Sequence, residues 1–469
     1  MTNYQASQAF SRAYRRVLKT KAPLLIIFLA VPLIAQDAPA PAPVASDPAP
    51  SAEYGGPAVL TRGAAASLRT PESIRLRPYV AFGGSYGSGI TPVSVTSNGE
   101  VPNIKTAGIE GEVGVLGYQR WKRSSLGLDY RGSYRHYFKD SYFNGSNQML
   151  GLVYTKQATR RVQFSLRESA GLISTGLFDT QQSSLIDPNF SHVPSNEIFD
   201  NRTLYLDTMG DLTYQKTARL SFNMGGDGFL ARRRSSSLYG VTGYRARGDV
   251  AYRTSRFATT GFAYNFTHYD FTKGFGASDI HTVQIAQSFR IGRSWELGLK
   301  VGGARVETLG LVSVAVDPVI TAITGQGRTV EAIYRIVWVP SMEGALTRSF
   351  RRASLTFSYA RGVSPGNGVY LTSRQETADA SFSYTGIRKW NLGLSGGYSS
   401  FGSLSRQLGN YEAYNGGGGA TYNATGALHL IIRYDYRHQA VTNNRFQRDT
   451  YRAYVGFGFS PGDLPLSLW

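Results

Sequence analysis

Cysteine is absent from the 469 residues of this chain, and no long hydrophobic run follows residue 35. The first absence excludes disulfides, zinc fingers and a lipidated N-terminal cysteine, and it fits an exported protein that folds without redox help. The second argues against a helical membrane protein, because a spanning helix needs ~20 apolar residues. The negative mean hydropathy does not make the chain soluble, since apolar and polar residues that alternate along strands average out.

The N-terminus has the features of an export signal. Basic residues without any acid precede an apolar segment, residues 22–35, of fourteen residues. This length suits the hydrophobic region of a signal peptide better than a membrane span. We predict a cleaved signal peptide over residues 1–35, with an uncleaved anchor as the alternative. Residues 36–73, rich in proline and alanine, are predicted to form an extended periplasmic linker, because such a composition cannot build a core.

A short basic turn recurs eight times after residue 74. The turns are centred near Lys122, Ala158, Thr217, Ser255, Arg293, Arg351, Arg388 and Thr425. Most neighbouring centres are 36 to 38 residues apart, and two gaps measure 58 and 59 residues. A spacing near 37 residues equals two strands, a tight turn and a longer loop, which is typical of an up-and-down barrel.

Between the turns, apolar and polar residues alternate with a period of two, as strands require. In residues 428–436, for example, Leu430, Ile432 and Tyr434 fall on one face, and Arg433 and Asp435 fall on the other. Every hairpin alternates in this way, and no second population of apolar strands is present to cover the first. We therefore expect the apolar face to contact lipid and the polar face to line a lumen.

Eight turns join sixteen strands, and one strand at each end raises the predicted count to 18. Sixteen is the alternative, should the stretch around Pro340 not span. We predict an all-β fold, a transmembrane antiparallel barrel over residues 74–460, with short periplasmic turns, longer extracellular loops and a C-terminal periplasmic tail at 461–469. The two long gaps hold the segments 176–200 and 306–329. Either segment could narrow the pore; the second could instead rise as a hairpin, and a surface excursion without a role is the alternative for both.

The chain at this point resembles the outer-membrane β-barrel proteins of diderm bacteria, the porin-like class. The resemblance rests on the topology and on the final strand, Tyr451-Arg-Ala-Tyr-Val-Gly-Phe-Gly-Phe459. It implies a location in the cell outer membrane, contact with lipid and lipopolysaccharide, and insertion by the barrel assembly machinery. Residues predicted to contribute to the assembly signal are Tyr454, Phe457, Phe459 and Trp469.

Charged residues gather in two places. Seven of the turns hold 17 Lys or Arg and no acid, which indicates a basic periplasmic rim that contacts phospholipid headgroups or draws in anionic solutes. The rim residues are Arg120, Lys122, Arg123, Arg160, Arg161, Lys216, Arg219, Arg256, Arg293, Arg351, Arg352, Arg388 and Lys389. Polar strand positions carry both signs and are predicted to line the pore: Arg131, Arg135, Arg167, Arg245, Arg247, Lys300, Arg335, Arg433, Asp435, Arg437, Arg452, Asp129, Asp207, Asp249 and Glu296.

A barrel of 16 or 18 strands is too wide for side chains to fill, so we expect a channel for passive passage of hydrophilic solutes. The alternatives are an exit barrel for exopolysaccharide, with a periplasmic partner docked on the linker, and a plugged structural or adhesive barrel. We expect no enzyme and no cofactor or metal, although His268 with Asp270, and Asp279 with His281, could form an Asp/His site. We expect no nucleic-acid partner, and either a monomer or a homotrimer.

Overall fold

The structure is a computed structural model, and it describes a chain made of strands. The described residues are 76–88, 104–139, 144–173, 203–234, 238–272, 276–292, 294–315, 328–366, 371–404, 410–442 and 447–461, with the side chains of 311–332 left aside. The predicted signal peptide, the linker and the segment 176–200 lie outside these residues, as do Arg293 and Trp469. No helix in the described ranges is both long and apolar enough to cross a membrane.

Eighteen strands form one sheet, which confirms the predicted count. Their bounds are β1 Arg77–Ser88, β2 Lys105–Arg120, β3 Ser124–Tyr137, β4 Gly145–Gln157, β5 Val162–Ile173, β6 Thr203–Gln215, β7 Leu220–Arg233, β8 Gly240–Arg253, β9 Ala258–Thr272, β10 Gly276–Ile291, β11 Trp295–Ala315, β12 Arg328–Ser349, β13 Ala353–Ser364, β14 Ser373–Tyr384, β15 Trp390–Ser403, β16 Tyr411–Asn423, β17 Leu428–Val441 and β18 Gln447–Phe459.

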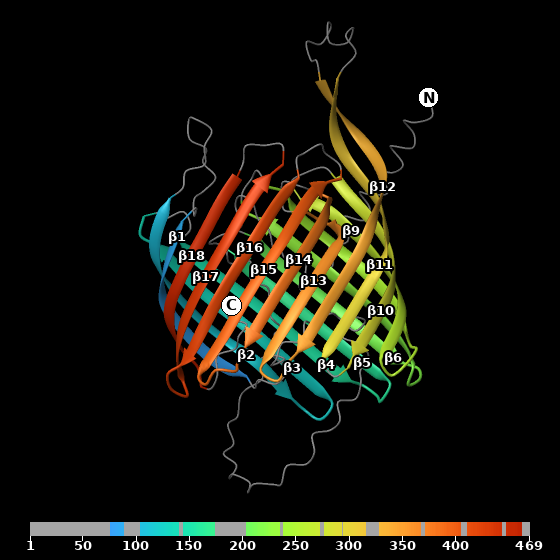
Figure 1. Ribbon diagram of the computed structural model, residues 1–469. Helices are drawn as coiled ribbons and strands as arrows, with labels where there is room; N and C mark the ends of the chain where they lie inside the picture. Colours follow the sequence, from blue (N-terminus) through green and yellow to red (C-terminus); the bar gives the residue numbers. More distant parts are fainter. Residues whose placement is uncertain are drawn as a thin grey trace, which may run out of the picture. The chain divides into compact units, whose positions relative to one another are not determined.

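The sheet closes on itself. Each strand pairs antiparallel with its neighbours in the chain, and β1 also pairs with β18, from Val80 opposite Phe459 to Ser88 opposite Tyr451. The result is the barrel seen in Figure 1. Pro340 lies inside β12, opposite Gly303 of β11, so the sixteen-strand alternative is wrong. Every described strand is therefore paired on both sides within the barrel wall, as a sheet surrounded by hydrocarbon requires, while residues 328–341 of β12 pair with β11 alone.

Side-chain hydroxyls stabilise several of the short turns. The Oγ1 atom of Thr217 accepts hydrogen bonds from the backbone amides of Arg219 (3.2 Å) and Leu220 (3.0 Å). Thr159 makes the same pair of bonds in the turn between β4 and β5, and Thr425 makes them between β16 and β17. A hydroxyl that bonds its own backbone two or three residues on favours a turn over a continued strand.

Strands β11 and β12 are the longest, with 21 and 22 residues. They remain paired to their ends, where Ala315 lies opposite Arg328, and they rise together above the rim in Figure 1. Much of the segment 306–329 therefore continues the barrel wall as a raised hairpin. Of the placements considered for this segment, the raised hairpin is the one observed for its described part, and a wedge inside the pore is not.

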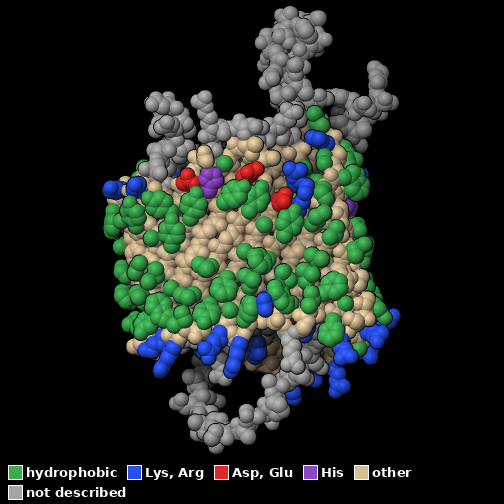
Figure 2. All heavy atoms as spheres, in the orientation of Figure 1, with side chains coloured by type: hydrophobic (Ala, Val, Ile, Leu, Met, Phe, Trp, Pro, Cys, Tyr) green, Lys and Arg blue, Asp and Glu red, His purple; other side chains and the backbone are tan. Residues whose placement is uncertain are grey.

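Large apolar side chains project from the outside of the barrel. Phe82 is 60 % exposed, Ile285 63 % and Trp338 71 %. Figure 2 shows such side chains as a broad green belt, with Lys and Arg gathered along the edge below it. Exposed apolar surface on this scale suits hydrocarbon and not water, so the fold is a transmembrane up-and-down β-barrel.

Candidate functional site

The inner wall of the barrel is the candidate site, and the strand register assigns its residues. Partners in an antiparallel pair share a face, so Phe82, opposite the exposed Phe457, fixes the outer row of β1 and β18. Applied around the sheet, this rule puts all fifteen residues of the predicted pore-lining set on the inner face. Whether they contact a passing solute stays a prediction.

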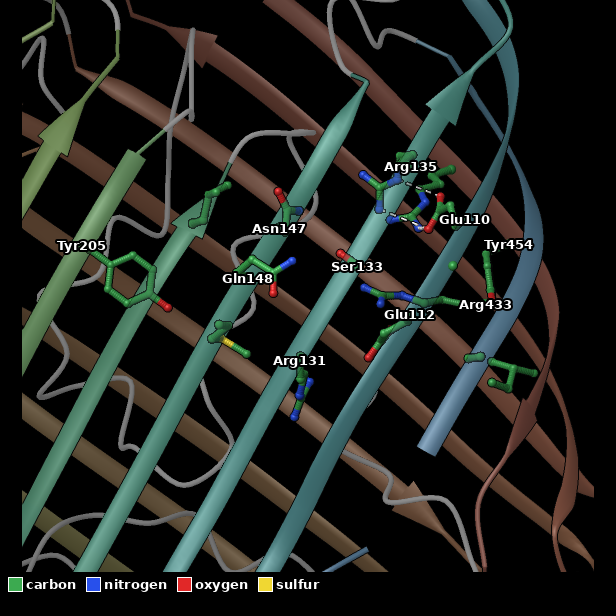
Figure 3. Close-up of a pocket in the computed structure, with 16 residues that line it drawn as sticks. Glu110, Glu112, Arg131, Ser133, Arg135, Asn147, Gln148, Tyr205, Arg433 and Tyr454 are labelled. Carbon is green, nitrogen blue, oxygen red and sulfur yellow. Dashed lines mark hydrogen bonds and ion pairs between the residues drawn. The ribbon is translucent and has the colours of Figure 1, made fainter. Parts of the chain in front are cut away.

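On β2, β3 and β18, inward carboxylates meet guanidinium groups. Oε2 of Glu110 accepts a hydrogen bond from Nη2 of Arg135 at 3.2 Å (Figure 3), and it also accepts one from Arg452 of β18. Arg131 and Asp129, two residues apart on β3, are joined at 3.0 Å. Tyr79 of β1 donates its hydroxyl to Glu112 at 2.6 Å. Buried charges are tolerated in a wall only when they are paired and hydrogen-bonded in this way.

A cavity of about 100 Å³ lies among these groups. Figure 3 shows Glu112, Arg131 and Arg433 around it, with Tyr205 on the far side. A drug-sized ligand needs several times this volume, roughly 300 Å³ or more. The cavity can therefore hold a few water molecules or a small ion between the charged groups, and it is too small for a drug-sized ligand.

A second ion-pair cluster joins β6, β7 and β8. Arg247 reaches Asp211 at 2.5 Å, and Arg245 reaches Asp227 at 2.8 Å. The side chains of both aspartates are fully buried. Nearby, Asn223 donates to Asp249 at 3.2 Å. Each of these pairs joins neighbouring or next-neighbouring strands, so the cluster ties this part of the wall together.

A third polar group joins β10, β11 and β12, and the sequence analysis missed one of its residues, Glu343, as well as Arg448 elsewhere on the inner wall. Lys300 of β11 is 2.8 Å from Glu343 of β12, and Gln284 of β10 donates to the same carboxylate at 3.1 Å. Glu343 was missed because Pro340 made the strand look interrupted. Arg448, which faces inward near the start of β18, was missed because the alternation is too short there to give a face.

The inner faces of β13, β14, β15 and β16 differ from the rest of the wall. They carry mostly serine, threonine, asparagine, glutamine, glycine and alanine, with Phe401 and Tyr411 near one end, and Asp379 is their only charged residue. We call these four inner faces the neutral arc. The inner faces of β2, β3, β5 to β8, β17 and β18 form the charged arc. In the neutral arc, four mid-strand residues are exposed on the lumen side, and we call them the open patch: Asp379, Ser381, Ser395 and Asn415.

The basic residues assigned to the rim are exposed wherever the structure describes them. They lie in or beside the short turns, at the end of the barrel where β1 begins and β18 ends, and Figure 2 shows Lys and Arg along that edge. Arg293 lies outside the described residues. Their contact with headgroups or solutes stays a prediction.

The histidines singled out in the sequence lie on the outer face. His268 has Asp279 at 2.6 Å from one ring nitrogen and Asp270 at 3.2 Å from the other. His281 contacts Tyr264 instead, at 2.9 Å. The expected pairing of His281 with Asp279 is not observed, since Asp279 lies opposite His268 in the register. The expected contact of His268 with Asp270 is observed, and this group faces away from the lumen.

The final strand separates the aromatic residues assigned to the assembly signal. Phe457 and Phe459 lie on the outer face and are about equally exposed, 60 % and 58 %. Tyr454 lies on the inner face, where it lines the cavity. Tyr454 therefore does not share the outward aromatic row, because the strand period of two puts it on the opposite side. Trp469 is outside the described residues.

Several solved structures are similar to this chain at low sequence identity. The chain is 10 % identical to a BenF-like porin from Pseudomonas fluorescens Pf-5, with a TM-score of 0.41. The alignment covers 82 % of this chain and 98 % of that one. It is 13 % identical to OccK5 (OpdH) from Pseudomonas aeruginosa, with a TM-score of 0.40 and the same coverage. It is 8 % identical to OccAB4 from Acinetobacter baumannii, with a TM-score of 0.38 over 84 % and 100 % of the two chains. No family model and no curated protein matches this chain, so its function has to be argued from its own residues.

Proposed function

We propose that this protein is an outer-membrane channel through which hydrophilic solutes pass by diffusion. One observation carries the proposal: a closed barrel of 18 strands is apolar outside and polar inside, and part of its inner wall is open to solvent. At this number of strands side chains no longer span the interior, and water can occupy it. In this proposal the charged arc acts as a fixed, ion-paired wall, and solutes pass beside the neutral arc.

The same proposal includes the surroundings of the barrel. Residues 1–35 act as a cleaved export signal, and the exposed basic turns face the periplasm, where they contact phospholipid headgroups of the inner leaflet. The opposite end, with the long loops, faces lipopolysaccharide. Insertion by the barrel assembly machinery uses the outward aromatic row that ends at Phe459. Catalysis has no part in this function.

Conductance in a planar bilayer tests the proposal. The chain without residues 1–35 would be folded in detergent, and its folded state checked by the heat-dependent shift in gel mobility. Stepwise conductance that rises linearly with voltage is the expected result. A folded barrel that never conducts, over repeated insertions and salt concentrations, would show a plugged structural barrel and would overturn the proposal.

A further inference from the structure

The open patch is formed by three neighbouring strands. Ser381 of β14 lies opposite Ser395 of β15, and Asp379 lies opposite Gly397, which in turn lies opposite Asn415 of β16. The four polar residues are the exposed part of an inner face that is otherwise half-buried or buried along these strands. A solute that moves along the neutral arc therefore meets these side chains first.

Two oxygen atoms converge within the open patch because a glycine separates them. A Cβ atom placed on Gly397 would lie 2.4 Å from Oδ1 of Asp379 and 2.8 Å from Oδ1 of Asn415. Both side chains thus lean over Gly397 from its two flanks, and the space above it is too small for any side chain. The arrangement is a niche with a carboxylate on one side and an amide on the other, facing the lumen.

Asp379 differs from the other inward acids in its partners. Asp129, Asp211, Asp227, Glu343 and Asp435 each lie within 3.0 Å of an arginine or lysine nitrogen. Asp379 has no ion pair or hydrogen bond among the residues that the structure describes. Its charge is therefore not neutralised by the described wall, whereas theirs is.

We propose that Asp379 and Asn415 form a subsite for the cationic group of a solute, so that this channel prefers cations although the chain is strongly basic. The inference rests on the proposed channel function and names its selectivity. Basic residues determine the formal charge of +19, but many of them lie in exposed turns or in ion pairs of the charged arc. Charge on the pore wall that is both exposed and unpaired sets ion preference, and in the described mid-barrel wall that charge is negative.

An ammonium group suits the niche because it is compact and donates hydrogen bonds to both oxygens. The hydroxyls of Ser381 and Ser395 lie one row away and can bond the polar remainder of such a solute. The substrate class is therefore a small hydrophilic molecule that carries a protonated amine. A bare monovalent cation is attracted to the same negative charge, but it cannot donate hydrogen bonds to the two oxygens.

Reversal potentials across a KCl gradient test the inference. The wild-type channel should favour K⁺ over Cl⁻, and Asp379→Asn should lower that permeability ratio by about twofold or more, because it removes an exposed negative charge from the pore wall. The matched control is Glu412→Gln on β16, which removes the same charge from the outer face of the same sheet; it should leave the ratio unchanged. Both variants should show the wild-type heat-dependent gel shift.

A second measurement separates an ammonium subsite from a general preference for cations. In liposome swelling, glucosamine should enter faster than glucose through the wild-type channel, and Asp379→Asn should remove that difference. Asn415→Asp should increase it. A channel that conducts but has the same reversal potential in Asp379→Asn overturns this inference alone; a shifted potential with equal swelling rates restricts it to small ions and overturns the ammonium assignment. A folded protein that does not conduct overturns the channel and the subsite together.

Discussion

The charged arc and the neutral arc belong to one sheet but differ in how their inward side chains are paired and buried. The charged arc uses long side chains whose charges cancel in pairs, such as Arg245 with Asp227, and most of its inward residues are buried. The neutral arc uses small side chains and leaves four mid-strand residues exposed to the lumen. The comparison shows that the number of charged residues on a barrel wall does not give the charge that a solute experiences. Pairing and burial remove most of these charged groups from contact with the solute.

Breaking an ion pair of the charged arc should have the largest effect. Asp227→Ala leaves Arg245 without its carboxylate at 2.8 Å and should lower the free energy of unfolding by about 3–5 kcal/mol, the usual cost of an uncompensated buried charge. Urea unfolding in lipid vesicles, followed by tryptophan fluorescence, measures it. Asp379→Ala in the neutral arc is the control and should cost less than about 1 kcal/mol, since no described partner is lost. An equal loss of unfolding free energy in the two variants would contradict the proposed difference between the arcs.

Filling the neutral arc should reduce conductance. Gly417 faces the lumen and its neighbour Gly418 faces lipid, as their register partners Asp435 and Tyr434 show. Gly417→Trp should lower single-channel conductance by roughly twofold or more, because a bulky ring narrows the open path. Gly418→Trp adds the same ring to the outer face and should leave conductance as it is. A blocked Gly418→Trp channel, or an unaffected Gly417→Trp channel, would mean that solutes pass elsewhere.

A single hydrogen bond in the charged arc should matter less than an ion pair. Tyr79→Phe removes the hydroxyl that donates to Glu112 at 2.6 Å. The expected loss of unfolding free energy is about 1.5–3 kcal/mol, typical of a hydrogen bond to a charged acceptor. The same vesicle assay gives the value. A loss as large as that of Asp227→Ala would indicate that Glu112 depends on Tyr79 for more than this one bond.

The smallest effect is expected from a hydroxyl of the open patch. Ser395→Ala replaces an exposed side chain, so the free energy of unfolding should change by no more than about 0.5 kcal/mol. Urea unfolding should therefore superimpose on that of the wild type. A clear destabilisation would show that the side chains of the open patch contribute to the stability of the barrel.

Much of the fold could be predicted because a strand records its two faces directly in the sequence. Leu430, Ile432 and Tyr434 alternate with Arg433 and Asp435, and the structure puts the two rows on opposite sides of β17. The basic turns gave the strand count for the same reason, since they recur at the spacing of a hairpin. This regularity weakens in two places: Pro340 left sixteen strands open as an alternative, and Tyr454, assigned to the assembly signal with Phe457 and Phe459, lies on the inner face.

The sequence by itself determined the class, the number of strands and the face of nearly every residue, because period and turn spacing depend only on positions along the chain. Which inward charges meet was decided by the tertiary structure. Glu110 and Arg452 are joined only because β18 returns to β1 and closes the sheet, and Asp379 stands without such a partner because its neighbours across β15 are glycine and asparagine. Pairing across strands depends on register, and register is a property of the closed barrel.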